Sequence, residues 1–102
     1  MARRLNLHEE LCEILGSRNV YFQPPSSMKL IYPCIVYSKT GVDIRNANNR
    51  IYKTDEQYQI ITIDYDPDSD IYHRILNHFP MSRFDRSYTA DNLNHNVITL
   101  YI

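Results

Sequence analysis

Four Asp residues alternate with other residues between positions 64 and 70, and hard cations bind clusters of carboxylate oxygens like this one. A calcium loop of the EF-hand type needs Gly at its sixth position and Glu at its twelfth. Counted from the first Asp, those positions hold Ser69 and Ile75, so the EF-hand motif is absent. The string Asp66-Pro67-Asp68 is instead typical of a helix start, with an Asp cap, Pro at the first helical position and acids in the first turn.

His8 and Cys12 stand four residues apart in a segment of helical periodicity, and side chains at this spacing can share one metal ion. Two ligands are too few for a structural zinc site, and the sequence offers no second cluster to complete it. A helix-face histidine beside a core cysteine is the favoured interpretation. Cys12 and Cys34 both lie in apolar surroundings without CxxC spacing, which predicts reduced core thiols of an intracellular protein.

The string Asn94-His95-Asn96 has the composition of an HNH nuclease motif. That metal-dependent chemistry needs a His base followed by a helix that carries a second His. Here the helix that carries His73 and His78 precedes the string, so the order is wrong. With only Gly16 and Gly41 in the chain, a glycine-rich loop that cradles a phosphate is excluded as well. We therefore predict no catalytic set, no bound metal and no cofactor.

The chain has 102 residues, the size of one domain, of which 43% are hydrophobic and 23% charged. The net charge is -1, so the basic excess of a general nucleic-acid binder is missing. The longest apolar run, residues 31–37, is interrupted by Pro33 and is far shorter than the ~20 residues of a membrane-spanning helix. These features predict one soluble domain over residues 1–102, with no membrane partner.

Tyrosine is unusually frequent, with nine copies alongside nine Asn and no Trp. A domain of this size buries only about 60–65% of its chain surface, so not all of its aromatic residues can be inside. Tyr and Asn suit interfaces because they combine contact area with hydrogen bonding. Two explanations stay open: a sheet whose outer face is half wet, and a subunit that buries tyrosines against copies of itself.

The first half of the chain predicts one helix and two strands. Residues 4–15 place leucines and isoleucines on one stripe of a 3.6-residue period, and Gly16 supplies the stop. Residues 20–22 form a short β-prone piece. Residues 28–38 alternate as a strong strand, in which Pro33 predicts a bulge or an edge because it cannot donate to the ladder.

The polar segment 39–53 follows, and we expect a long hairpin arm or a surface loop there. Ile51 and Tyr52 could open a further short strand within it. A segment of this length in a small domain is often functional. It is therefore a candidate arm for gripping a neighbouring molecule.

The second half predicts a strand at 56–66, a helix at 68–79 closed by Pro80, and two strands at 83–89 and 96–102 joined by a turn at 90–95. The predicted order is α-β-β-β-α-β-β. We therefore expect an α+β fold, a single domain in which a mixed or antiparallel β-sheet packs against two helices.

In length and order of elements the chain resembles the tail terminator, or tail completion, proteins of long-tailed bacteriophages. The residues that carry the resemblance are Leu7-His8-Glu9-Glu10-Leu11, Tyr32-Pro33-Cys34-Ile35-Val36-Tyr37, Tyr58-Gln59-Ile60 with Thr62-Ile63-Asp64, Asp66-Pro67-Asp68-Ser69, and Phe84-Asp85-Arg86 through Tyr88 to Asp91-Asn92-Leu93-Asn94-His95. The resemblance rests on pattern and order over most of the chain, not on a catalytic motif.

That resemblance implies a structural virion protein whose copies form a homohexameric ring. The ring would cap the tail tube, stop its growth and join the tail to the head-tail connector, or stopper, protein. DNA would pass through the lumen without specific binding, and the protein would occur in the virion neck and in the host cytoplasm during assembly. The alternatives that stay open are another head-completion or adaptor protein and a small metal-dependent nuclease.

A ring subunit needs self-complementary surfaces, and polar or tyrosine-rich segments are the candidates. We expect the interface tyrosines among those with polar or charged sequence neighbours, and arginines that pair with acids of a neighbouring copy. The predicted subunit-interface residues are Tyr37, Asp43, Asn46, Asn48, Asn49, Arg50, Tyr52, Tyr72, Arg83, Arg86 and Tyr88.

Overall fold

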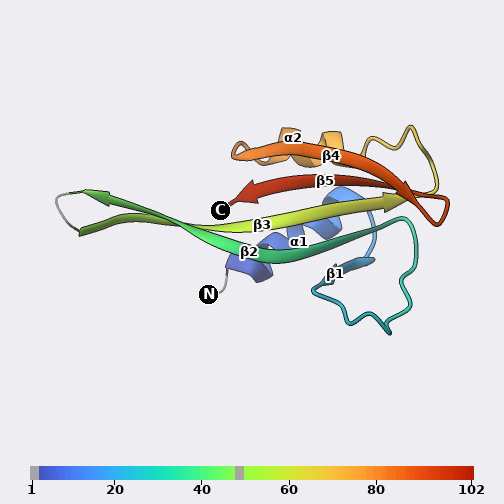
Figure 1. Ribbon diagram of the computed structural model, residues 1–102, viewed down its shortest axis with the longest axis horizontal. Helices are drawn as coiled ribbons and strands as arrows, with labels where there is room; N and C mark the ends of the chain where they lie inside the picture. The colour runs from blue at the N-terminus through green and yellow to red at the C-terminus, as the bar shows by residue number, and fades with distance from the viewer. Residues whose placement is uncertain (1–2, 48–49) are drawn as a thin grey trace.

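In the part of the chain that the structure describes, five strands form one mixed sheet in the order β1-β2-β3-β5-β4, and two helices lie on one of its faces (Figure 1). The computed structural model describes residues 3–47 and 50–102, and of these it leaves the side chains of residues 3, 43–47 and 50–54 undescribed. The elements are α1 (Arg3–Leu15), β1 (Val20–Phe22), β2 (Cys34–Ala47), β3 (Arg50–Asp64), α2 (Ile71–His78), β4 (Ser82–Ala90) and β5 (Leu93–Tyr101).

The predicted α+β class and the predicted order of elements are confirmed. β1 pairs with β2 in parallel, and the other three strand pairs are antiparallel. No helix in the described part of the chain is long and apolar enough to cross a membrane.

The main core lies between the helices and the sheet. Leu7 and Leu11 of α1 and Ile75 of α2 are fully buried against it. Side chains that alternate along the strands supply the other layer, since every second residue of a strand points to the same face. The buried sheet residues of this layer are Val20, Ile35, Tyr37, Tyr58, Ile60, Ile98 and Leu100.

The opposite face of the sheet carries a smaller cluster of Cys34, Ile63 and Leu93. The segment between β1 and β2 packs over it with Leu30 and Tyr32. The predicted strand at 28–38 is therefore too long at its start, because β2 begins only at Cys34, directly after a cis Tyr32–Pro33 peptide. The residues before Cys34 cover the sheet and do not extend it.

β2 and β3 continue together well beyond the rest of the sheet (Figure 1). Their register runs from Cys34 opposite Ile63 to Ala47 opposite Arg50, whereas β5 pairs with β3 only over residues 57–64. Residues 43–47 and 50–55, hereafter the arm, form a two-stranded ribbon in a molecule 51 Å long and 24 Å wide. The predicted hairpin arm is confirmed. The alternative surface loop is wrong, as is a separate short strand at Ile51.

Two local predictions are corrected at the loops. The second helix begins at Ile71, not at residue 68, and its cap residue Asp70 makes no side-chain cap hydrogen bond. Asp66 instead forms a turn before the helix, with its carboxylate accepting the Asp68 N–H at 2.9 Å. β5 begins at Leu93 because the turn holds only two residues, numbers 91 and 92, both at positive φ as a tight hairpin requires.

Candidate assembly surfaces

β4 is one of the two terminal strands of the sheet, and within the described residues no strand pairs with its outer edge. Every residue of β4 after Ser82 is exposed. An uncovered strand edge presents backbone donors and acceptors that can pair with another chain. The candidate contact surface consists of β4 and the residues of β5 that face it, His95 and Thr99 among them. It is hereafter called the β4 strip.

A β-bulge at Asp85 sets the direction of the charged side chains of the β4 strip. The register places Arg83 opposite Thr99, then skips Asp85 and places Arg86 opposite Val97. Because Thr99 and Val97 lie two residues apart on β5, both arginines are on the same face of the sheet. This is the face that the helices do not cover.

Asp85 connects the two strands at the bulge. Its carboxylate accepts a short hydrogen bond from the Thr99 hydroxyl and a second one from Arg83 Nε at 2.9 Å. These bonds, that from Thr99 foremost, hold the pKa of the Asp85 carboxyl below its usual range. The Arg83 side chain remains 68% exposed, so its guanidinium is accessible to an acid of another molecule.

Tyr88 and His95 stack face to face further along the β4 strip, with ring centroids 4.6 Å apart and an interplanar angle of 11°. The Arg86 guanidinium lies 5.8 Å from the centre of the Tyr88 ring. Phe84 points to the other face, where its ring lies 5.4 Å from that of Tyr72 on α2. The β4 strip thus combines aromatic rings with cationic groups, a composition typical of interface cores.

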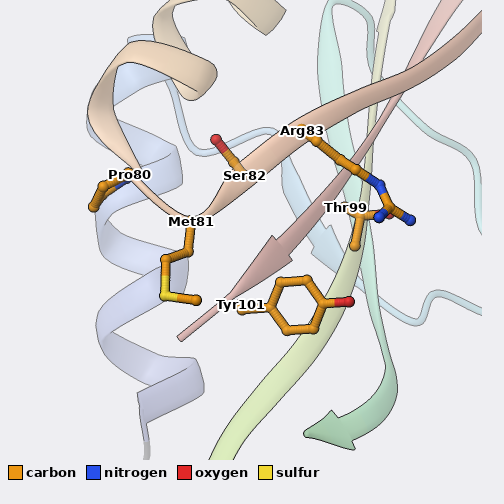
Figure 2. Close-up of a pocket in the computed structure, with 6 residues that line it drawn as sticks. All are labelled: Pro80, Met81, Ser82, Arg83, Thr99 and Tyr101. Carbon is orange, nitrogen blue, oxygen red and sulfur yellow. The ribbon is translucent and has the colours of Figure 1, made fainter.

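Two hollows flank the β4 strip. The apolar one, of about 310 Å³, lies where β4 starts and β5 ends, and Figure 2 shows its lining. That lining is Pro80, Met81, Ser82, Arg83, Thr99 and Tyr101. The second, polar and about 210 Å³, is lined by Pro67, Ser87, Tyr88, Thr89, Asn94, His95 and Asn96. The apolar hollow is mostly open to solvent, which suits a protein surface more than an enclosed small ligand.

The prediction that Tyr37 is an interface residue is wrong. Tyr37 is only 1% exposed, because β2 lies inside the sheet and α1 covers it. Its hydroxyl is 2.8 Å from Nδ1 of His8, and its ring lies 5.0 Å from that of Phe22 and 6.1 Å from that of Tyr58. A side chain that is covered within one copy cannot contact another, so Tyr37 is a core residue.

The structure brings three of the predicted residues together, namely Arg83, Arg86 and Tyr88, on the β4 strip. Tyr72 is half-buried on α2 and meets this group through Phe84. The others belong to the hairpin of β2 and β3, and their side chains lie outside the described residues. They are Asp43, Asn46, Asn48, Asn49, Arg50 and Tyr52, of which Asn48 and Asn49 have no described backbone either.

Sequence reasoning missed Phe84, Met81 and Tyr65, which are large and exposed in the structure. The sequence predicts a strand at 83–89 that includes Phe84, but only the strand order shows that this strand lies at the edge of the sheet. The two buried cysteines are free, as predicted, and burial raises the pKa of the Cys34 thiol to about 11.

The residues considered for metal binding have other partners. His8 contacts Tyr37, His78 Nε2 lies 3.3 Å from Glu10 Oε1, and His95 Nδ1 lies 3.1 Å from the Leu93 carbonyl oxygen. Among residues 3–47 and 50–102, no three His, Cys, Asp or Glu side chains gather as a metal site would need. No protein-family model, no curated protein and no solved structure matches the chain. What the protein does is therefore inferred from its own surfaces.

Proposed function

We propose that this protein is a structural subunit of a long-tailed bacteriophage, whose copies assemble into a ring that caps the tail tube and joins the tail to the head connector. Its partners are further copies of itself in a hexamer, the tail tube protein and the connector or stopper protein. DNA passes through the lumen without specific binding. The protein acts in the virion neck and is assembled in the host cytoplasm, and its role needs no catalytic group and no cofactor.

The arm is the observation that supports this proposal most strongly. A two-stranded hairpin is marginally stable in water, and a third strand or a covering helix is usually needed. Within residues 3–47 and 50–102, no third strand pairs with the arm. A neighbouring molecule that packs on the arm would supply the third strand or the cover that the hairpin needs for stability. Self-assembly is the simplest source of such a neighbour.

The β4 strip adds a second surface on a different part of the molecule. Contacts that join different surfaces of neighbouring copies are heterologous, and they close into rings when the rotation between copies is suitable. A net charge of -1 also suits a conduit that must let DNA pass without holding it.

Deleting residues 43–49 tests the proposed function. The variant should fold, because the main core lies outside the arm, but it should stay monomeric and fail to join tails to heads. The measurements are mass in solution, binding to purified tail tubes and completion of infectious particles. A deletion variant that still completes particles, or a wild-type protein that neither forms rings nor binds tubes, contradicts the proposal.

A further inference from the structure

An apolar patch lies at the end of the molecule opposite the arm. Ile31 is 62% exposed and Tyr65 is 65% exposed, and Tyr65 meets Tyr32 edge to face with ring centroids 5.9 Å apart. These three residues are hereafter called the tyrosine patch, and Tyr32 among them packs against the small cluster of Cys34, Ile63 and Leu93. Figure 1 shows the two loops that carry them at the opposite end of the sheet from the arm.

The tyrosine patch is bordered by acidic residues. Four Asp and no Lys or Arg occur between positions 64 and 70. Asp66 and Asp68 are exposed, and Asp70 is paired with Arg74 at 2.9 Å. A partner that fits here would bring apolar side chains for the tyrosine patch and positive charges for its border.

The arm has that composition. It holds three basic residues, Arg45, Arg50 and Lys53, and two acids, Asp43 and Asp55. The two acids are register partners at the base of the arm, and the basic residues lie beyond them. Apolar or aromatic residues, Ile44 and Ile51 among them, are interspersed with these charges. Charge and hydrophobic character are thus complementary between the two ends of one chain.

We propose that the arm of one copy docks on the tyrosine patch of the next copy, with its basic residues facing the acidic border. This inference rests on the proposed ring assembly and names the surfaces that make it. The two surfaces lie at opposite ends of a molecule 51 Å long, so a copy does not bind its own arm. The contact is head to tail, which is the kind that can close a ring.

Charge changes of equal size on the two sides test the docking. The arm variant carries Arg45→Gln and Arg50→Glu, and the patch variant carries Asp66→Asn, which keeps the turn acceptor, with Asp68→Lys. Each should weaken self-association roughly tenfold or more, and combining them in one chain should restore part of the loss. Wild-type association should also weaken as salt is raised.

Two controls separate docking from folding. Glu13→Lys on α1 changes the charge by as much as Asp68→Lys but lies on an exposed helix position, so association should be unchanged. Tyr65→Ser removes the apolar contact at a residue that is mostly exposed, so the melting temperature should stay near that of the wild type while association falls.

Mixing two defective proteins tests the head-to-tail geometry. The variant that lacks residues 43–49 keeps its tyrosine patch, and the patch variant keeps its arm. Together they offer one intact pair of arm and tyrosine patch, so a one-to-one dimer should form at protein concentrations at which each variant alone is monomeric. Sedimentation or native mass spectrometry measures this.

These measurements distinguish a failure of the proposed docking from a failure of the proposed ring function. If the mixture stays monomeric, or if the patch variant assembles like the wild type while the arm deletion does not, the docking is wrong and the proposed ring function stands. If neither the deletion nor the patch variant alters assembly and particle completion, the proposed function fails together with the docking.

Discussion

Tyr37 and Tyr88 have the same side chain, lie on strands of one sheet and each contact a histidine, yet they occupy opposite environments. Tyr37 is 1% exposed and hydrogen-bonded to His8 beneath α1, whereas Tyr88 is 41% exposed and stacks on His95 at the edge of the sheet. β2 has neighbouring strands on both sides, and Tyr37 lies on the face that the helices cover, whereas β4 has a neighbouring strand on one side only and Tyr88 lies on the uncovered face. The position of the strand in the sheet, and not the residue type, separates core from surface.

The covered region beneath α1 and the exposed β4 strip also differ in the charge state that they favour for ionisable side chains. Beneath α1, burial lowers the pKa of His8 and raises that of Tyr37, so the covered region disfavours ionised groups. On the β4 strip, hydrogen bonds keep the Asp85 carboxyl ionised by lowering its pKa. The covered region therefore provides stability, and the edge keeps charged groups at the surface, where they can serve recognition.

Tyr37→Ala should have the largest effect on stability. Removing a fully buried ring leaves a cavity, and the expected loss in the free energy of unfolding is about 3–5 kcal/mol. Chemical denaturation monitored by circular dichroism measures it. Should that variant fail to fold, Tyr37→Phe removes only the hydroxyl and should cost about 1 kcal/mol. If Tyr37→Ala and Tyr37→Phe each lowered the free energy of unfolding by less than about 1 kcal/mol, Tyr37 would not be a core residue.

Thr99→Val should destabilise the protein by roughly 1–2 kcal/mol at pH 7, because Asp85 loses its main hydrogen-bond donor. The folded-state pKa of Asp85 is lowered, so this contribution is present above the unfolded pKa near 4 and is lost as the pH falls through the lower folded value. The difference between variant and wild type should therefore shrink between pH 4 and pH 2. Thr89→Val, at an exposed position of β4, is the control and should show no such trend.

His8→Gln should flatten the pH dependence of stability in the mildly acidic range. Burial, followed by the charges of Arg18 and Arg4, lowers the folded-state pKa of His8. The unfolded chain therefore takes up this proton first, and wild-type stability falls as the pH drops below about 6.5. The difference between the two unfolding curves, measured from pH 7.5 to pH 5, isolates His8 from the other histidines. Parallel curves for the two proteins would refute this account.

Tyr88→Ala should have the smallest effect on stability, below about 1 kcal/mol, because the ring is largely exposed and loses mainly its stacking on His95. Its effect on assembly should be much larger if the β4 strip is an interface, since buried interface tyrosines commonly contribute 2 kcal/mol or more. Arg83→Ala and Arg86→Ala provide the matching comparison. Variants that assemble normally would place these residues outside the ring contact.

Local signals in the sequence were sufficient for most elements. The leucine stripe predicted α1 to within one residue of its start, and Gly16 ends that helix at a φ of 84°, where its N–H donates to the Cys12 carbonyl. Alternation also assigned the faces of β3 correctly, with Tyr58, Ile60 and Thr62 buried on the same side. These features depend on residues that are close to one another in the sequence, so the sequence alone predicts them.

The candidate contact surfaces were predictable only in part. Arg83, Arg86 and Tyr88 are close in sequence and remain together on β4, but the bulge at Asp85 that aligns the two arginines depends on Thr99. The polar composition of residues 39–53 predicted a projecting segment. It left open whether that segment is a hairpin arm or a surface loop, and the structure shows the hairpin, formed by the continuation of β2 and β3.

By itself the sequence determined the class, the order of elements and the apolar stripe of each helix, because periodicity records which side chains avoid water. The tertiary structure alone decided which strand lies at the edge, and hence that Tyr37 is covered and Tyr88 is not. It also decided that the arm extends beyond β5 while the tyrosine patch lies at the far end. Such relations depend on strand order and on contacts between distant segments, and no local pattern encodes which element will cover a given face.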